Sequence, residues 1–358
     1  MKKRAILSAG GTGGHLFPAQ SLAEALPDWE ILFVAGGLST SRYFNRELFC
    51  FEEIPCATFS LKSPMHMCKG IGKICLGIQR SQKILQKFNP DVVVGFGSFF
   101  TLPVLVAASF LRKPIVIHEQ NTVLGKVNRL FAPWVHTTAI TFPMTRTYLN
   151  RKTAKKAVEV IFPQRVRSPS TVQEAWDYFG LCTCEKPLIL VFGGSQGSIR
   201  LNALFLEVLP RLPPIQVLHF TGNERDAFSA RLRYQELGIS ACVKPFEPRM
   251  DLAMRIADYG VTRAGAATVC ELIHNTLPAL LIPFPFAAEN HQEKNGEHFV
   301  SIVKGGKMYK EKELNAERLA DGIVQQLANR EAFKNNIRAY KQHRRAIHLA
   351  DLIQDIII

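Results

Sequence analysis

The sequence predicts an α/β protein built from two parallel-sheet domains, and three observations predict it. The chain has 358 residues, which suits two domains better than one. Short continuous apolar runs alternate with helical patterns, as expected of strands that are covered on both faces. The two halves also open alike, because residues 4–15 and 188–198 each combine an apolar strand with a glycine-rich turn.

Eight apolar runs are predicted to be strands, four in each half. They are residues 5–9, 31–35, 92–95 and 115–118, and then 188–192, 217–221, 259–262 and 280–283. A polar, proline-bearing stretch near 162–170 separates the halves, so we expect two Rossmann-like, doubly wound domains over residues 1–162 and 163–336. The tail, 337–358, mixes basic and aliphatic residues with helical spacing and is expected to pack back on the first domain.

Composition narrows the class of protein. With 47% hydrophobic and 21% charged residues, the chain is neither mainly disordered nor fibrous. The net charge is +14, and residues 1–162 carry 20 basic against 9 acidic side chains. Such an excess suits nucleic acid, an anionic membrane surface or a phosphorylated substrate, and no nucleic-acid-binding motif accompanies it.

The chain also lacks the sequence patterns of export and of membrane insertion. No run approaches 18 uncharged apolar residues, and the apolar segment after the basic start breaks at Gly10. Eight cysteines without a CxxC motif predict reduced, mostly buried thiols. We therefore expect a cytoplasmic protein.

Two glycine-rich turns, 10–15 and 193–198, predict close backbone approach to a ligand. The dinucleotide pattern GxGxxG fails, because Leu16 stands where its last glycine belongs, and the second turn lacks the Lys-Ser/Thr pair of an ATP-binding loop. A phosphate cradle remains open, as do tight strand-to-helix turns without a ligand. The chain has no Asp-x-Asp, so no metal is predicted, and helix N-termini and arginines would stabilise a leaving diphosphate.

Polar residues follow several predicted strands. His15 lies on the first glycine turn, where an imidazole can take a proton from an attacking hydroxyl, and 118–121 (HEQN) follow another strand. Thr268 and Glu271 suit either a helix cap or a carboxylate that binds a ribose. The run 289–295 (ENHQEKN) is typical of a solvated helix start or of a sugar site, and spacing does not separate the two.

A basic amphipathic segment spans residues 62–90. Ile71, Ile74, Ile78 and Leu85 share one side of a helix, and most of the cations share the other: Lys62, Lys69, Lys73, Arg80, Lys83 and Lys87. Such a helix either lies on anionic lipid or packs its apolar side on the core with a solvated basic face.

Five motifs together, GGTGGHLFP (10–18), HEQN (118–121), GGSQGS (193–198), RAGAATVCE (263–271) and ENHQEKN (289–295), resemble the MurG family of bacterial N-acetylglucosamine transferases, in glycosyltransferase family 28. The resemblance implies a GT-B fold and transfer of GlcNAc from UDP-GlcNAc to the C4 hydroxyl of MurNAc in undecaprenyl-pyrophosphoryl-MurNAc-pentapeptide, which converts lipid I into lipid II. It further implies inversion, no metal or other cofactor, a peripheral position on the cytoplasmic face of the inner membrane, and proteins of cell-wall synthesis and division as partners.

The resemblance also assigns site residues. His15 would be the general base. The UDP-GlcNAc contacts would be Thr12, Gly13, Gly14, Asn121, Arg167, Ser195, Gln196, Phe246, Glu247, Thr268, Glu271, His291 and Gln292, and the membrane contacts Lys69, Ile71, Lys73, Ile74, Ile78 and Arg80. One departure stands before Arg167, where Pro163-Gln164-Arg165-Val166 replaces the family's Gly-Asn-Pro-Val.

Two other functions stay open at this stage. One is a GT-B glycosyltransferase that glycosylates another lipid, such as diacylglycerol. The other is a membrane scaffold that keeps the nucleotide-sugar fold without turnover, against which His15, Glu271 and Gln292 argue.

Overall fold

In the computed structural model the chain divides into two compact units, Met1–Arg167 with Arg345–Ile358, and Ser168–Arg344. The structure describes residues 2–57, 64–164, 171–194 and 196–357, and for 64–69 the backbone only. The return to the first unit begins at Arg345 and not at 337 as expected, because helix α13 (Arg330–His343) belongs to the second unit. There Lys341 Nζ donates to the carbonyl of His274 at 2.6 Å.

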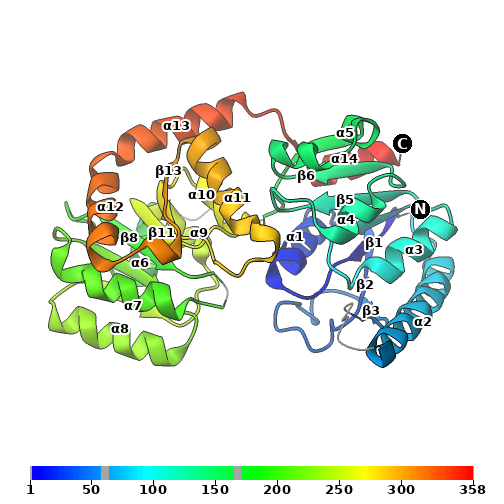
Figure 1. Cartoon of the computed structure of the whole chain (residues 1–358), viewed down its shortest axis with the longest axis horizontal. Coiled ribbons are helices and arrows are strands. Elements are labelled where there is room, and N and C mark those ends of the chain that lie inside the picture. The colour runs from blue at the N-terminus through cyan, green and yellow to red at the C-terminus, as the bar shows by residue number, and fades with distance from the viewer. Residues whose placement is uncertain (1, 58–63, 165–170, 195, 358) are drawn as a thin grey trace. The chain divides into compact units, whose positions relative to one another are not determined.

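The first unit contains an eight-stranded parallel sheet with the order β14-β7-β6-β5-β4-β1-β2-β3. The strands are β1 (Arg4–Ser8), β2 (Glu30–Ala35), β3 (Phe51–Glu53), β4 (Val92–Gly95), β5 (Ile115–Glu119), β6 (Thr137–Ile140), β7 (Ala157–Ile161) and β14 (Ile347–His348). The helices are α1 (Gly13–Glu24), α2 (Pro64–Phe88), α3 (Leu102–Phe110), α4 (Lys126–Phe131), α5 (Arg151–Lys155) and α14 (Leu349–Ile356) (Figure 1).

Both faces of this sheet are covered, which explains the continuous apolar strands. Alternate residues of β1 belong to different cores: Leu7 packs with residues of α1 and α14, and Ile6 packs with residues of α2, α3 and α4. The last helix completes the first of these cores, because Leu349, Leu352 and Ile353 of α14 are buried in it.

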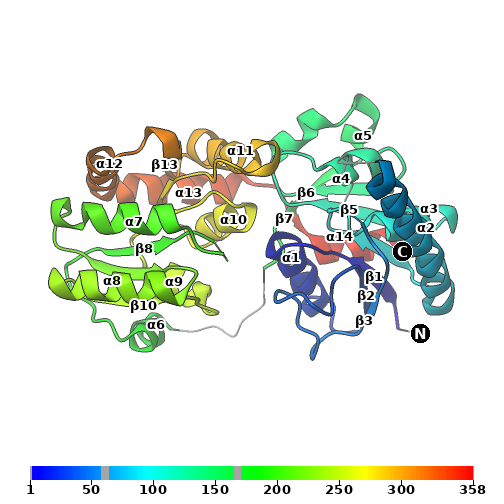
Figure 2. The same ribbon diagram turned by 60° about the horizontal axis from the view of Figure 1, so that its bottom comes forward.

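The second unit contains a six-stranded parallel sheet with the order β10-β9-β8-β11-β12-β13. The strands are β8 (Leu188–Phe192), β9 (Gln216–Phe220), β10 (Ala241–Lys244), β11 (Tyr259–Thr262), β12 (Ala279–Leu281) and β13 (Gly306–Met308). The helices are α6 (Val172–Phe179), α7 (Ile199–Val208), α8 (Glu224–Glu236), α9 (Met250–Ile256), α10 (Ala266–His274), α11 (His291–Glu297), α12 (Ala316–Ala328) and α13, and Figure 2 shows them from a second direction.

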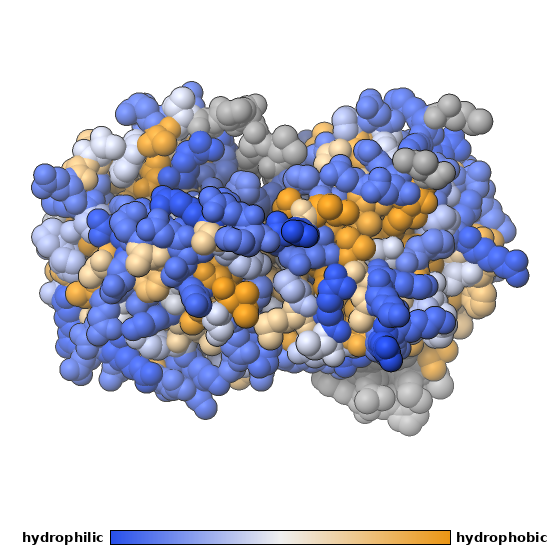
Figure 3. Space-filling model, turned by 90° about the horizontal axis from the view of Figure 1, so that it is seen from above, coloured by the Kyte–Doolittle hydropathy of each residue, from blue (hydrophilic) through white to orange (hydrophobic). Residues whose placement is uncertain are grey.

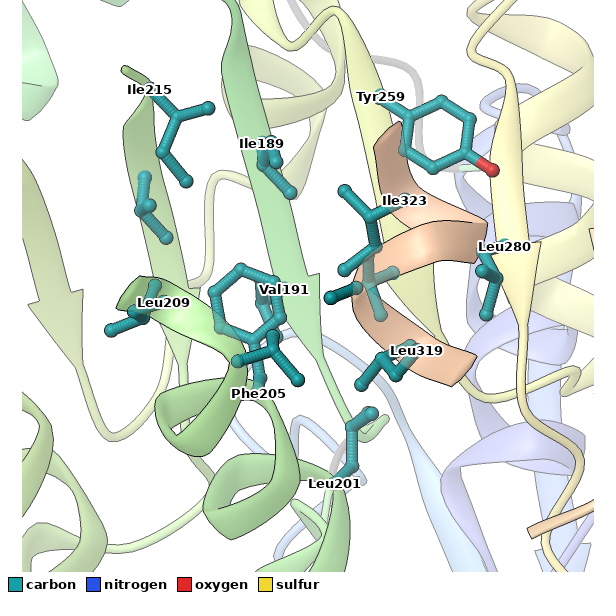
Figure 4. Packing of buried hydrophobic residues seen from close by; sticks show 14 of the residues in the cluster. Ile189, Val191, Leu201, Phe205, Leu209, Ile215, Tyr259, Leu280, Leu319 and Ile323 are labelled. Atoms are coloured by element: carbon teal, nitrogen blue, oxygen red, sulfur yellow. The ribbon is translucent and has the colours of Figure 1, made fainter. Parts of the chain in front are cut away.

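One core cluster of this unit joins the sheet to α7, α8 and α12. Phe205 of α7 is fully buried beside Val191 of β8, and Ile323 of α12 lies across from Ile189 (Figure 4). These contacts hold the strand that leads into the second glycine-rich turn.

In both sheets the strand order reverses beside the strand that carries the glycine-rich turn. In the first sheet the neighbouring strands β3-β2-β1-β4-β5-β6 follow the order 3-2-1-4-5-6. In the second sheet β10-β9-β8-β11-β12-β13 follow the same order when they are numbered from β8. The reversal lies between β1 and β4 in the first sheet and between β8 and β11 in the second. Ligands of such sheets bind beyond the carboxyl ends of the strands at this point.

All eight strands predicted from the sequence are present, within two residues at each end. The described residues contain six further strands that the sequence analysis did not predict: β3, β6, β7, β10, β13 and β14.

Candidate active site

The first glycine-rich turn leads from β1 into α1. Gly11 has a positive φ of 88°, and a Cβ at Gly13 would meet the Phe17 ring at 2.7 Å, so the turn needs glycine at both positions. Thr12 is the N-cap residue of α1, and its side chain makes no capping hydrogen bond. The turn therefore places His15 in the first turn of α1.

The backbone fixes the tautomer of His15. Its Nδ1 lies 2.7 Å from the carbonyl oxygen of Phe96, which follows β4 across the point where the strand order reverses. A carbonyl only accepts, so Nδ1 carries the hydrogen and Nε2 keeps the lone pair. Burial lowers the pKa of His15, while the Phe96 carbonyl and the Gln120 side chain raise it in part. The net direction keeps the ring neutral near pH 7, as a general base requires.

The predicted HEQN cluster lies at the end of β5, next to β4. His118 is fully buried, and burial, together with the charge of His15, lowers its pKa to about 3. Its Nε2 lies 3.2 Å from Thr141 Oγ1 and its Nδ1 lies 3.2 Å from Gln120 Nε2. His118 is therefore a neutral buried residue and not a second base.

Glu119 anchors the start of α4. Its carboxylate accepts from the backbone N–H of Gly125 at 2.8 Å, from that of Asn121 at 3.0 Å and from Asn128 Nδ2 at 2.9 Å. Burial raises the pKa of Glu119, and these hydrogen bonds oppose the rise. The carboxylate thereby holds the backbone of Asn121, a predicted sugar contact.

The second glycine-rich turn leads from β8 into α7. A Cβ at Gly197 (φ 71°) would overlap the backbone at Thr221, so the turn packs tightly against the end of β9. Ser198 is the N-cap residue, and its Oγ accepts from the backbone N–H of Leu201. Gln196 is exposed beside it, which leaves its amide accessible at the N-terminus of α7.

Sequence reasoning missed Arg263, although this residue connects three loops of the second unit. Its side chain is 5% exposed; Nη1 donates to the carbonyls of Ile282 and Pro283, and Nη2 donates to Ser198 Oγ at 2.6 Å. Glu311 forms an ion pair with the same guanidinium. The signal was an arginine directly after an apolar strand, where a buried charge needs partners.

Gln292 lies in the first turn of α11 and joins two strand-end loops. Its Oε1 accepts from the backbone N–H of Ala264 at 3.2 Å and from that of Phe284 at 3.0 Å. The side-chain amide is thereby oriented, because only its oxygen can accept. Among the described residues the Nε2 group has no hydrogen-bond partner, which leaves its two N–H donors available to a ligand.

His291 precedes Gln292 on a turn of unusual backbone geometry. Glu289 and Asn290 both adopt a positive φ, 51° and 54°, which is costly for residues other than glycine. The Nδ1 of His291 lies 2.8 Å from the carbonyl oxygen of Ala288. Such a turn is typical of a functional loop and argues against a plain solvated helix start.

Thr268 and Glu271 both lie inside α10. The N-cap residue is Gly265, without a side-chain capping bond, so the helix-cap interpretation of Thr268 and Glu271 is wrong. Thr268 is 8% exposed and Glu271 is partly exposed one turn further along.

Phe246 and Glu247 follow β10. Phe246 is 60% exposed, whereas the Glu247 carboxylate is buried and accepts from Tyr178 Oη at 3.0 Å, from Lys244 Nζ at 2.7 Å and from the backbone N–H of Arg249 at 2.6 Å. The buried carboxylate fixes this loop and presents the Phe246 ring to solvent.

Helix α2 packs one side on the core. Ile74 is buried, so its assignment as a membrane contact is wrong: the helix turns it toward α3 and the sheet. Ile78 is partly buried and packs against the same cluster. Ile71 and Leu76 are 47% and 58% exposed, with Lys73 exposed between them. Arg80 is exposed too and lies 3.7 Å from Glu52. The surface in Figure 3 is mainly hydrophilic, with hydrophobic residues gathered in places over the first unit.

Some predicted residues lie outside the described part of the chain: Arg167, Ser195 and the side chain of Lys69. Of the seven cysteines in the described part, four are exposed (Cys50, Cys75, Cys182 and Cys184), so the prediction of mostly buried thiols is wrong. Over the described ranges, no helix is long and apolar enough to span a bilayer, and no three His, Cys, Asp or Glu side chains group as a metal site.

Both units match known families. Residues 5–140 match the glycosyltransferase family 28 N-terminal domain, and residues 188–351 match the glycosyltransferase family 28 C-terminal domain. A UDP-N-acetylglucosamine–N-acetylmuramyl-(pentapeptide) pyrophosphoryl-undecaprenol N-acetylglucosamine transferase from Protochlamydia amoebophila is 42% identical over 86% of this chain and 82% of its own. The protein of the same name from Chlamydia pneumoniae is 34% identical over 96% of each chain.

Solved structures agree with these relatives. The crystal structure of Acinetobacter baumannii MurG superposes with a TM-score of 0.77 at 25% identity, over 99% of this chain and 100% of that one. A UDP-glucose: anthocyanidin 3-O-glucosyltransferase, with a TM-score of 0.67 at 14% identity, shares the fold. The predicted GT-B fold is confirmed, and the chain belongs to glycosyltransferase family 28.

Proposed function

We propose that this chain transfers GlcNAc from UDP-GlcNAc to the C4 hydroxyl of MurNAc in undecaprenyl-pyrophosphoryl-MurNAc-pentapeptide, converting lipid I into lipid II. The observation that carries this proposal is the state of His15 in a chain of family 28: a neutral imidazole, with Nδ1 bound to a backbone carbonyl and Nε2 left as a base. The names of the curated relatives supply the donor and the acceptor.

The reaction is a single displacement. His15 Nε2 takes the proton of the C4 hydroxyl while that oxygen attacks the anomeric carbon of the donor. The bond from this carbon to the β-phosphate oxygen breaks at the same time, and UDP leaves with its electron pair. Attack from the face opposite to UDP inverts the donor's α linkage into a β1→4 linkage.

The second unit holds the donor in this proposal. Backbone N–H groups at the start of α7, with Ser195 and Gln196, face the diphosphate, where the helix dipole favours negative charge. The Phe246 ring and the backbone of Glu247 bind the uracil, and Glu271, beside Thr268, binds the ribose hydroxyls. His291 and Gln292 bind the GlcNAc hydroxyls, Gln292 through its two free N–H donors.

The first unit binds the acceptor in this proposal. Thr12, Gly13 and Gly14 bring the backbone of the first turn to the reacting groups, and Asn121 contacts the GlcNAc. Arg167, which corresponds to the family's arginine, contacts UDP-GlcNAc.

The first unit also binds the membrane, at the cytoplasmic face of the inner membrane. Ile71 and Leu76 would enter the interface between head groups and acyl chains, while Lys69, Lys73 and Arg80 attract anionic lipid. Sedimentation with vesicles that contain phosphatidylglycerol tests this assignment. The Lys73→Gln protein should bind about fivefold more weakly, since each cation near such a surface contributes about 1 kcal/mol. Lys152→Gln on α5, which removes the same charge elsewhere, should bind like the wild type; equal binding by all three proteins would remove Lys73 from the surface.

Incubation of the purified protein in EDTA with radiolabelled UDP-GlcNAc tests the reaction. A lipid I analogue and a diacylglycerol are offered in parallel, and the labelled lipid is identified. The proposal predicts label in the disaccharide-lipid only. Label in the glycolipid would favour the diacylglycerol-type transferase, and donor binding without product would favour a non-catalytic scaffold.

A further inference from the structure

Gln120 shares the hydrogen-bond partner of His15. Its Nε2 lies 3.0 Å from the Phe96 carbonyl oxygen, the same atom that binds His15 Nδ1 at 2.7 Å. Nε2 also lies within 3.3 Å of the carbonyl oxygen and 3.2 Å of the Nδ1 of His118. A carbonyl oxygen cannot donate, so only the nitrogen of the Gln120 amide can occupy this position, and the orientation of the amide is fixed.

The oxygen of the Gln120 amide accepts no hydrogen bond from the described residues. Gln120 is 1% exposed, and its Oε1 is buried without a hydrogen-bond partner among the described residues. A buried amide oxygen without a partner carries an uncompensated desolvation cost. Such an arrangement is expected where positive charge appears during the reaction.

We infer that Gln120 is a positioning residue for the transfer reaction: it binds the carbonyl that orients His15 and stabilises the imidazolium that forms when Nε2 takes the acceptor's proton. This inference rests on the proposed function, because it assumes that His15 is the base.

The surroundings of His15 support this assignment. The ionisable neighbours on the adjacent strand end are His118, which burial keeps neutral, and Glu119, whose carboxylate is bound to the N-terminal end of α4. Neither of them therefore provides a negative charge to the His15 ring. The Phe96 carbonyl and the Gln120 side chain raise the pKa of His15 against the larger effect of burial, so both favour the cation.

The test compares Gln120→Met, which keeps the size of the side chain and removes its polar atoms, with the wild type. We expect kcat to fall roughly tenfold to a hundredfold, the range for a lost hydrogen bond to a charged group, with the KM for UDP-GlcNAc unchanged. The acid limb of the rate profile should move to lower pH, since the loss of Gln120 lowers the pKa of His15 further.

Nitrogen-15 spectra of labelled His15 provide a second readout that needs no turnover. The ring should titrate at a lower pH in Gln120→Met than in the wild type, while its neutral form keeps the hydrogen on Nδ1, because the Phe96 carbonyl is still present. Thr138→Val is the matched control, because Thr138 Oγ1 is another buried oxygen without a partner in the described structure and lies on β6, which β5 separates from β4. It should leave the rate profile and the His15 titration unchanged.

The outcomes separate the two proposals. If the wild type forms no product while His15 still titrates lower in Gln120→Met, the proposed function fails and the positioning of His15 stands. If the wild type is active and Gln120→Met keeps both its rate and the His15 titration, Gln120 has no positioning role. A lower rate with an unmoved titration would assign Gln120 to packing alone and would equally overturn the inference.

Discussion

Gln292 allows its structural role and its proposed binding role to be tested separately. The Oε1 atom bonds two backbone N–H groups, and the Nε2 group is assigned to the sugar. Gln292→Glu keeps an acceptor oxygen and replaces the NH2 group, with both its N–H donors, by a second, negatively charged acceptor oxygen. Gln292→Met removes the acceptor and the donors together. The two variants are similar in size, so they differ in which hydrogen bonds they lose and in the charge that Glu adds.

The structure sets the size of the effect. Ala264 is fully buried, so its N–H would lose its partner without gaining water, whereas Phe284 is 43% exposed and its N–H can turn to solvent. One buried donor left unpaired costs about 1–3 kcal/mol. In a unit of this size that corresponds to a fall in Tm of roughly 2–12 °C. Gln292→Met should show this fall, and Gln292→Glu should melt close to the wild type.

The affinity for the donor should fall in both variants. Both lack the N–H donors, so both should bind UDP-GlcNAc more weakly, by roughly tenfold for a lost pair of hydrogen bonds to neutral hydroxyls, while UDP alone binds as before. Calorimetric titration with the two ligands measures this. A Gln292→Glu protein that binds UDP-GlcNAc like the wild type would refute the assignment of Nε2 to the sugar. A Gln292→Met protein with an unchanged Tm would refute the role of Oε1.

Three further predictions concern His15, His219 and two glycines of α2. Because burial lowers the pKa of His15 and the base must be neutral, kcat/KM should fall with falling pH through a midpoint below 6.5, as a pH series would measure; a midpoint above 6.5 would contradict the charge state. Burial lowers the pKa of His219 to about 3 in the folded protein, so below pH 6.5 the unfolded chain binds more protons and the free energy of unfolding decreases as the pH falls. In urea unfolding from pH 6 to 4, His219→Gln should reduce the dependence of this free energy on pH by about 1.4 kcal/mol per pH unit. An unchanged dependence would contradict the burial of a neutral ring. On α2, a Cβ at Gly77 would overlap the Pro55 carbonyl, whereas one at Gly72 meets nothing within 4 Å; Gly77→Ala should destabilise the protein and Gly72→Ala should stabilise it by about 0.5–1 kcal/mol, and equal effects would contradict the packing of α2.

The strands that the sequence predicted are those with two buried faces. Val92–Gly95 and Leu188–Phe192 are fully buried, so they appear as continuous apolar runs. The strands that it missed are short or mixed in character. β10 contains Lys244, whose ammonium binds the buried Glu247, and β14 has only two residues, both exposed. Pairing with a neighbouring strand forms such elements, and the local sequence contains little signal of that pairing.

Residues of the candidate site were predictable where a polar side chain lies on a glycine-rich turn or in a polar run after an apolar strand. His15 and Gln292 are of this kind. Their orientation was not predictable, because it depends on backbone atoms distant in sequence: the Phe96 carbonyl lies 81 residues from His15, and the Ala264 N–H lies 28 residues from Gln292. Every residue type offers the carbonyl, and every type except proline offers the N–H, so the sequence does not mark these positions.

Helix α2, which was predicted to contact the membrane, shows a different limit. Helical spacing correctly grouped Ile74 and Ile78 on one side, but spacing alone does not distinguish a side that meets lipid from one that meets the core. Contact with α3 and the sheet decides for the core, and exposed residues such as Ile71 and Leu76 remain for the surface.

The most direct test of the central claim is the single-turnover rate at which enzyme preloaded with labelled UDP-GlcNAc forms the labelled disaccharide-lipid from a lipid I analogue, for the wild type and for His15→Ala. General-base catalysis predicts that the variant binds the donor normally and transfers the sugar roughly 10²–10⁴ times more slowly. A His15→Ala protein that forms product at the wild-type rate would contradict the assignment of the base, and with it the mechanism proposed for this enzyme.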